Sequence, residues 1–411
     1  MNGLIHPKKI KMMKKIKYLL SLILLLPLLT NAQQRISVDE LIEIATGNNY
    51  QNTVNDARIK KAEFDKSAVT EFPKTGLFIE NEDFSPSNPK GEWKIGIEQE
   101  IPWPGMNKAR KNYMEQLISV HKMNREAIKA EITRDVKKSY YELWYLQEKK
   151  TLYHQLDSIY NDMFNAAVVR YNVGDVAGLD KIAAEAKFKE IRAQMSQLDK
   201  EIEIWQKQLM LLTNQQIYFL PEERALTRII SDELSETGVH PSLLVVMQNI
   251  EADKSMIEVQ RQSNKPEFSA RVFSQSYLGI KDPLSGFSVG VDFPLFGKKS
   301  NKNKISALEA EVEAGETELK WKEQNLKSQQ EQSLLKLEKE EIMLVFYEES
   351  GLEQSEAIIS AASLSYRSGE ISFSEMSSFM IQAIDIRQNY LETLNTYNQA
   401  MIEYQYLMNH Q

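Results

Sequence analysis

The sequence predicts a mainly α-helical protein with a small β part, built from two similar halves that each hold one β-hairpin and one pair of long helices. Three observations predict this class. Long tracts lack proline, which helix interiors exclude because of its missing N–H and its ring. Two short segments alternate apolar and polar residues, as strands do. The landmarks of the first half recur in the same order roughly 190 residues later, which indicates an internal duplication.

Residues 1–32 have the pattern of a secretory signal peptide. Six lysines precede an apolar run from Tyr18 to Leu29, and the small residue Ala32 offers a cleavage point. The alternative, an uncleaved anchor helix, needs a longer apolar run. Removing these six lysines takes the formal net charge from -8 to -14, and so acidic an exported protein is a poor candidate for binding nucleic acid.

The composition excludes several classes of site. The chain has no cysteine, which excludes a disulfide framework, a thiolate metal site and a lipidated N-terminal cysteine. With a mean hydropathy of -0.44 it is not a helical membrane protein. Because it has five histidines and no glycine-rich phosphate loop, we expect no enzymatic activity and no cofactor. We interpret the 16 methionines as packing residues and expect no metal site.

The long helices are predicted from the proline-free tracts. Between Met106 and Val173 there is neither glycine nor proline, and apolar residues recur at steps of three and four. Such a helix would be roughly 100 Å long and must pack lengthwise against others. Gly315 and Gly351 are weak points in the second half. The predicted helices span 106–170, 179–212, 298–367 and 374–410.

The alternating segments predict β-hairpins over 76–103 and 267–296. Strands of about ten residues with one apolar and one polar face suit an outer-membrane barrel, whereas the alternative is a half-buried hairpin of a soluble protein. Four strands cannot close a barrel, for which about eight is the minimum, so we expect several copies to assemble. The aromatic residues expected at membrane interfaces are Trp93, Trp103, Phe287 and Phe296.

The predicted division of the chain follows these elements. It consists of a signal peptide over 1–32, a first repeat over 33–220, a connector over 221–240 and a second repeat over 241–411. Each pair of long helices is joined by a short break containing a glycine, which we interpret as the turn of a helical hairpin.

Four motifs in this order carry a family resemblance. They are Tyr171-Asn172-Val173-Gly174 with its counterpart Tyr366-Arg367-Ser368-Gly369, and the sequences after the strands, Pro102-Trp103-Pro104-Gly105 and Pro294-Leu295-Phe296-Gly297. With them the chain resembles the TolC-type outer-membrane efflux family over essentially its whole mature length. The stretch from Pro102 to Arg110 is similar to the heavy-metal branch of that family, the CzcC or CusC-like proteins.

The resemblance implies a homotrimer in the outer membrane of a Gram-negative bacterium. Its strands would form one 12-stranded barrel in outer-membrane lipid, and its helices a periplasmic α-barrel. The partners implied are a periplasmic adaptor protein and an inner-membrane pump of the RND type. The function implied is passive conduction of pump substrates. The alternatives are the outer-membrane channel of a type I protein secretion system and an exported coiled-coil scaffold without a pore. The cargo, whether metal cation, drug or protein, stays open.

The resemblance also implies a gate at the hairpin tips. Asp180, Tyr366 and Glu375 align with the family's closing contacts, beside the turn residues Tyr171, Gly174 and Gly369. Two family positions differ, because Ser378 replaces an acidic residue and Ile371 replaces an arginine. The alternative for Asp180 and Glu375 is a solvated helix face.

Overall fold

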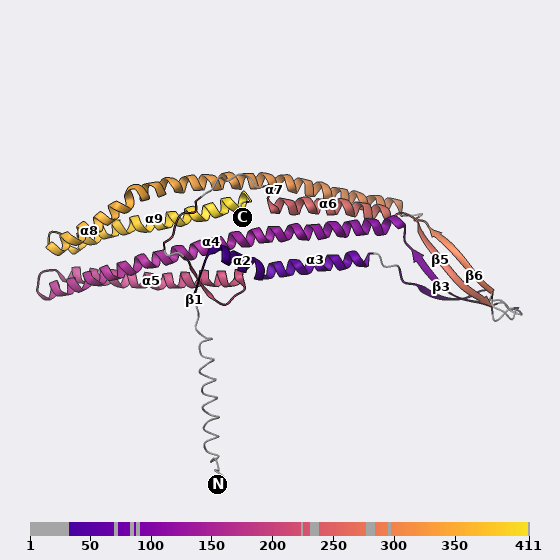
Figure 1. Ribbon diagram of the computed structural model, residues 1–411, viewed down its shortest axis with the longest axis horizontal. Coiled ribbons are helices and arrows are strands. Elements are labelled where there is room, and N and C mark those ends of the chain that lie inside the picture. Colours follow the sequence, from indigo (N-terminus) through magenta and orange to yellow (C-terminus); the bar gives the residue numbers. More distant parts are fainter. Residues whose placement is uncertain are drawn as a thin grey trace, which may run out of the picture. The chain divides into compact units, whose positions relative to one another are not determined.

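The computed structural model describes the chain from residue 33 to residue 409 with short gaps (Figure 1). The predicted signal peptide and Phe296 lie outside the described residues. The described ranges are 33–69, 73–82, 86–87, 91–222, 225–230, 238–276, 284–294 and 297–409.

The chain divides into two compact units. Of the described residues, one unit holds those from 33 to 41 and from 139 to 226, and the other holds those from 42 to 138 and from 227 to 409. Both units draw on separate stretches of chain, because helix α4 (Pro104–Asn172) contributes to each of them. The duplication of the two halves remains a prediction from the sequence.

The first unit contains the end of α4, helix α5 (Gly178–Thr213) and a parallel pair of short strands, β1 (Gln33–Ile36) and β4 (Tyr218–Pro221). The two helices run as a hairpin whose rings Phe164 and Phe188 stack with centroids 6.0 Å apart. Both predicted helices are confirmed. Helix α4 begins two residues early, at Pro104, because proline fits the first turn, where its missing N–H costs nothing.

Strand β4 is fixed by a buried amide of the first unit. The Gln206 side chain accepts a hydrogen bond from the Phe219 N–H at 2.9 Å and donates one to the Phe219 carbonyl at 2.5 Å. The Tyr140 hydroxyl donates to the carbonyl of Ile36 at 3.0 Å. These strands have four residues each, which is too short for sequence periodicity to predict them.

The helices of the second unit form a row. Helix α2 (Val38–Asn48) leads from the first unit into α3 (Tyr50–Ala68). Hydrogen bonds join α3 to α4, α4 to α6 (Pro241–Gln262), and α6 to α7 (Lys298–Phe346). Helix α9 (Phe373–Leu407) packs on α7 and accepts a hydrogen bond from Ser333 at the Ala400 carbonyl. Helix α9 also bonds to α4, through the Gln399 side chain and the Lys138 carbonyl, so it lies between α4 and α7. Helices α3 and α7 are therefore the two edges of the row.

The predicted helix over 298–367 is interrupted once. A π-helical turn, Tyr347–Gly351, separates α7 from α8 (Leu352–Ser368), so the predicted weak point at Gly351 is confirmed. Gly315 stays inside α7, where a Cβ would lie 3.0 Å from Ile250. That glycine permits close approach of α6 and α7 without breaking the helix.

Both predicted hairpins are confirmed and join into one antiparallel sheet of the second unit. Its strands are β2 (Gly76–Glu82), β3 (Glu92–Ile101), β5 (Glu267–Ser276) and β6 (Leu284–Asp292). The order is β2-β3-β5-β6, so β3 pairs with β5 across the two halves (Figure 1). Among the described strands, β2 and β6 are the edges. Within the described part of the chain, helices with the length and apolarity to cross a membrane are absent.

Candidate functional site

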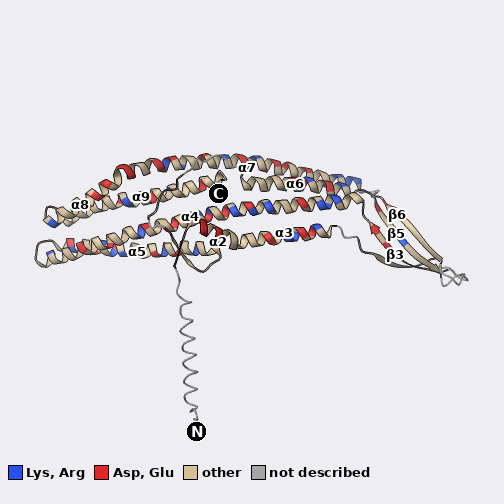
Figure 2. Ribbon diagram, viewed as in Figure 1, with Lys and Arg blue, Asp and Glu red and all other residues tan. Residues whose placement is uncertain are grey.

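The two faces of the sheet differ completely in charge. In the observed register, residues with charged side chains all fall on one face, which we call the polar face. The opposite face, which we call the apolar face, carries no charged residue on any of the four described strands. Figure 2 colours acidic and basic residues along the ribbon, and the charged residues of the four strands are Glu80, Glu82, Glu92, Lys94, Glu98, Glu100, Glu267, Arg271 and Asp292.

The apolar face is uncovered in the single chain. Phe287 at its middle is 80% exposed, and Val272, its partner on β5, is 58% exposed. A contiguous apolar surface of this kind marks a site that meets lipid or another protein. Other residues of the apolar face that are more than half exposed are Leu77, Ile79, Trp93, Ile95, Ile97 and Val289.

The aromatic residues predicted at membrane interfaces lie at different positions along the strands. Trp93 lies near the hairpin end of β3, and Trp103 follows the other end of that strand. The Trp103 ring stacks on Phe268 with centroids 5.9 Å apart. These two tryptophans therefore bracket the sheet at both ends. Phe287 pairs with Val272 in the middle of the strands, away from both ends.

The polar face is held together by ion pairs across strands. The Arg271 guanidinium on β5 lies 2.9 Å from a Glu98 oxygen on β3 and 3.5 Å from a Glu80 oxygen on β2. The Lys94 ammonium lies 2.6 Å from Glu82. These contacts tie three of the four strands together on the side opposite the apolar face.

The first hairpin tip owes its shape to its glycine. Gly174 has a φ of 81°, a left-handed conformation that costs other residues about 1–2 kcal/mol. Its N–H donates to the Tyr171 carbonyl, and the Asp175 N–H donates to the Arg170 carbonyl. Together these bonds form a Schellman motif, which ends α4. The Arg170 side chain also pairs with the Asp175 carboxylate at 2.6 Å.

The second hairpin tip repeats this geometry. Gly369 has a φ of 77°, its N–H donates to the Tyr366 carbonyl, and the Glu370 N–H donates to the Ser365 carbonyl. The repeated sequence Tyr-x-x-Gly is thus a Schellman motif with glycine in its left-handed position. The sequence predicts the turn, and the structure adds the hydrogen bonds that form it.

Glu375 has a defined local role in the second tip. It forms a capping box with Ser372, whose hydroxyl accepts from the Glu375 N–H while the Glu375 carboxylate accepts from the Ser372 N–H at 2.8 Å. The Ser372 N–H and the Ser372 hydroxyl both donate to the Glu375 carboxylate, which holds the pKa of Glu375 below its usual value. The motif Ser-x-x-Glu was the available sequence signal. Its role in a gate stays a prediction.

The two tip tyrosines have different surroundings. Tyr171 is 45% exposed, and the Lys181 ammonium lies 5.1 Å from its ring centroid. Tyr366 is 8% exposed and packs edge-on against Phe373 within its own hairpin. Asp180 lies half-buried in the first turn of α5. The structure places Tyr366 and Glu375 in one hairpin, and Asp180 in the other.

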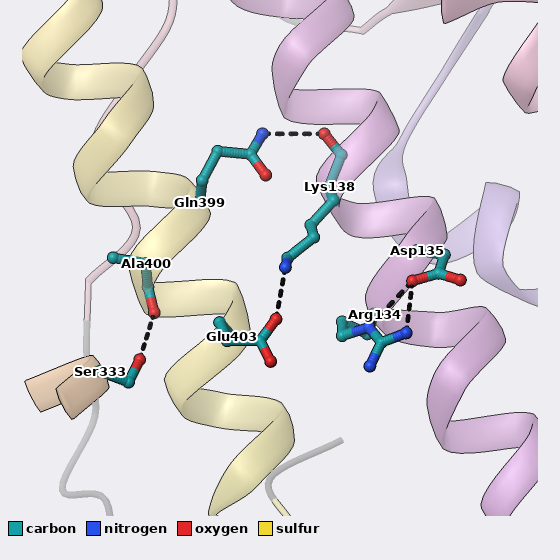
Figure 3. Close-up of polar contacts among 7 residues, drawn as sticks. All are labelled: Arg134, Asp135, Lys138, Ser333, Gln399, Ala400 and Glu403. Atoms are coloured by element: carbon teal, nitrogen blue, oxygen red, sulfur yellow. Dashed lines mark hydrogen bonds and ion pairs between the residues drawn. The ribbon is translucent and has the colours of Figure 1, made fainter. Parts of the chain in front are cut away.

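A polar groove lies between α7 and α9 in the second unit (Figure 3). Its volume is about 710 Å³. Lys138 of α4 pairs with Glu403 of α9, and the Gln399 side chain donates to the Lys138 carbonyl at 2.9 Å. Ammonium, carboxylate and amide groups line it, so the groove can form hydrogen bonds and ion pairs. Among the described residues, no cluster of three or more potential ligands could hold a metal ion.

One family of known proteins matches part of the sequence. The family model described as "Outer membrane efflux protein" matches residues 80–215, from β2 through both helices of the first tip. The sequence resemblance to the outer-membrane efflux family is confirmed. No curated protein matches the chain.

Solved structures of outer-membrane channels have the same fold. The chain is similar to the CmeC outer membrane channel of Campylobacter jejuni, with 13% identity, a TM-score of 0.74 and coverage of 91% of this chain and 85% of that one. It is similar to CusC, with 13% identity, a TM-score of 0.73 and coverage of 92% and 95%. For the open state of the Neisseria gonorrhoeae MtrE channel the identity is 15%, the TM-score 0.71 and the coverage 90% and 88%. The predicted fold class is therefore confirmed.

Proposed function

We propose that this efflux-family chain is the outer-membrane exit duct of a tripartite efflux system and conducts substrates passively from a pump and adaptor to the outside. The duct consists of three copies, whose sheets together form one 12-stranded barrel. The observation that carries the proposal is the distribution of charge on the sheet, with all charged strand residues on one face and none on the other.

Lipid is the partner that the apolar face fits. Strands β3, β5 and β6 have 10, 10 and 9 residues, and a tilted strand needs about 9–11 to cross a bilayer. Trp93 and Trp103 bracket the apolar band, as aromatic side chains do at membrane interfaces. The polar face then lines an aqueous lumen. A scaffold without a pore would leave the apolar face without a partner to cover it.

The open edges of the sheet require more copies of the chain. An unpaired strand edge is not viable in lipid, because its backbone N–H and C=O groups would lose their hydrogen bonds. Among the described strands the edges are β2 and β6, two different surfaces of one chain. Pairing β6 of one copy with β2 of the next is heterologous, and such pairing forms a ring when the rotation from copy to copy closes.

The helical row of the second unit offers matching edges. Its outer helices α3 and α7 expose apolar side chains that the single chain leaves uncovered. On α3 these are Tyr50, Val54 and Phe64, and on α7 they include Trp321, Leu335 and Ile342. The same heterologous arrangement can therefore serve the helices and the strands, which supports one ring of several copies.

The hairpin tips are the proposed entrance and the surface for the adaptor. At the first tip Val173 and Leu179 are 75% and 74% exposed, and at the second tip Leu364 is 70% exposed. Exposed apolar residues at a tight turn fit a protein partner. Asp180, Tyr366 and Glu375 are the proposed gate residues, with an RND-type pump behind the adaptor. The second candidate function is the channel of a type I protein secretion system. The type of pump encoded by a neighbouring gene would distinguish the two functions.

The experiment that tests the duct is conductance in planar lipid bilayers. Purified mature protein should give discrete current steps after insertion. Insertion is checked independently by flotation of the same preparation with lipid vesicles. Protein that floats with lipid and carries no current, with the tips intact or with both tip hairpins shortened, would refute the duct.

A further inference from the structure

Arg271 occupies the centre of the polar face. It lies on β5, where its register partners are Glu98 on β3 and Ser288 on β6. Its guanidinium contacts two carboxylates, Glu98 at 2.9 Å and Glu80 at 3.5 Å. One cation on this face thus offsets negative charge on both strands of the neighbouring hairpin.

A row of alternating phenylalanine and glycine positions this arginine. Phe78, Gly96, Phe273 and Gly286 are successive partners across the four strands. A Cβ on Gly96 would lie 2.7 Å from the Phe78 ring, so the rings occupy the space above the glycines. Arg271 lies over Phe78 at 5.3 Å from the ring centroid, within the range of a cation–π contact. Lys94 lies over Phe273 at 5.9 Å.

The net charge of the polar face is strongly negative. Seven carboxylates and two cationic side chains give a net formal charge of -5 per chain on the four described strands. Four of these carboxylates form no ion pair with another described residue. They are Glu92, Glu100, Glu267 and Asp292.

We propose that the polar face makes the membrane section of the duct selective for small cations, and that Arg271 sets the strength of this selectivity by neutralising Glu80 and Glu98. This inference rests on the proposed function. It places a determinant of specificity in the sheet, separate from the hairpin tips. Fixed charge on the wall of a narrow lumen concentrates counter-ions and repels ions of its own sign.

The salt concentration should control the proposed cation selectivity. Screening extends over about 10 Å at 0.1 M salt and about 3 Å at 1 M. Wall charges therefore act across the lumen in dilute salt and lose their reach in concentrated salt. The selectivity should be pronounced at 0.1 M and nearly absent at 1 M.

The test is the reversal potential of the full mature protein in a planar bilayer under a KCl gradient. Arg271→Gln changes the face from -5 to -6, about one fifth, and should shift the reversal potential toward the potassium equilibrium value. Glu100→Gln removes a carboxylate outside any ion pair and should shift it the opposite way. The matched control is Arg125→Gln, which removes an arginine paired with Asp56 between α4 and α3, and should cause no shift.

The outcomes separate the inference from the duct itself. A wild-type current without cation preference at 0.1 M salt would overturn the inference, as would equal shifts in Arg271→Gln and Arg125→Gln. A preference that changes only with Asp180→Asn would locate selectivity at the tip and also overturn it. Lipid-inserted protein without any current would instead refute the proposed duct. If Arg271→Gln fails to assemble, the shift of Glu100→Gln decides.

Discussion

A lysine in place of Val272 should prevent stable insertion of the sheet. Val272 lies in the middle of β5 on the apolar face, between Ile97 and Phe287. At the bilayer midplane a lysine costs about 2–4 kcal/mol, which is roughly 30- to 1,000-fold in the folding equilibrium of each chain. In the proposed barrel of three copies, the cost would rise to roughly 6–12 kcal/mol per assembly.

The matched control lies on the same strand. Ser269 faces the opposite side, between Glu100 and Gly290, so Ser269→Lys places the new charge on the polar face beside a carboxylate. We expect a change within about 1 kcal/mol for this control. Guanidinium unfolding from lipid vesicles, followed by tryptophan fluorescence, measures both variants. Equal midpoints for Val272→Lys and Ser269→Lys would refute the assignment of the two faces.

Three further predictions concern the gate, a helix cap and pH. Asp180→Ala or Tyr366→Phe should raise bilayer conductance, and an unchanged conductance would remove these residues from the gate. Ser372→Ala deletes the cap of α9 and should cost about 1 kcal/mol, seen as roughly fivefold faster hydrogen exchange in its first turn; unaltered exchange would contradict the cap. Burial lowers the pKa of His240, and the charge of Arg134 lowers it further, so as the pH falls the unfolded chain binds a proton before the folded chain does. Stability should therefore fall as pH drops below about 6.5, and less so in His240→Asn, which keeps a capping acceptor; parallel pH profiles would contradict this.

The sequence was most informative where a tract with helical periodicity was long. The tract after Met106 has no glycine or proline, so its periodicity alone defined α4 to within two residues at each end. Short elements gave no such signal. Strands β1 and β4 have four residues each and depend on Gln206 and Tyr140, whose side chains reach their backbone from distant positions.

The sequence predicts which residues belong to the candidate site, but it predicts less well how buried they are and what they contact. The alternation of apolar and polar residues predicts that Trp93 lies on the apolar face. It does not predict the position of Phe287 in the middle of the sheet, which follows from its pairing with Val272. The turn motif predicted both glycines, since each occupies a left-handed position. It could not show that Tyr171 is exposed and Tyr366 buried, because burial depends on packing against Phe373. The Arg271 ion pairs depend on the pairing of β3 with β5, which alternation cannot specify.

The number of copies in the assembled protein tests the central claim most directly. Native mass spectrometry of the mature chain, released from outer-membrane lipid in mild detergent, counts them without assumptions about cargo or partners. Three chains per particle are predicted, because three sheets of four strands make up the proposed 12-stranded barrel, whereas one four-stranded sheet with two open edges cannot close in lipid. A stable, folded single chain in the same detergent would contradict the account.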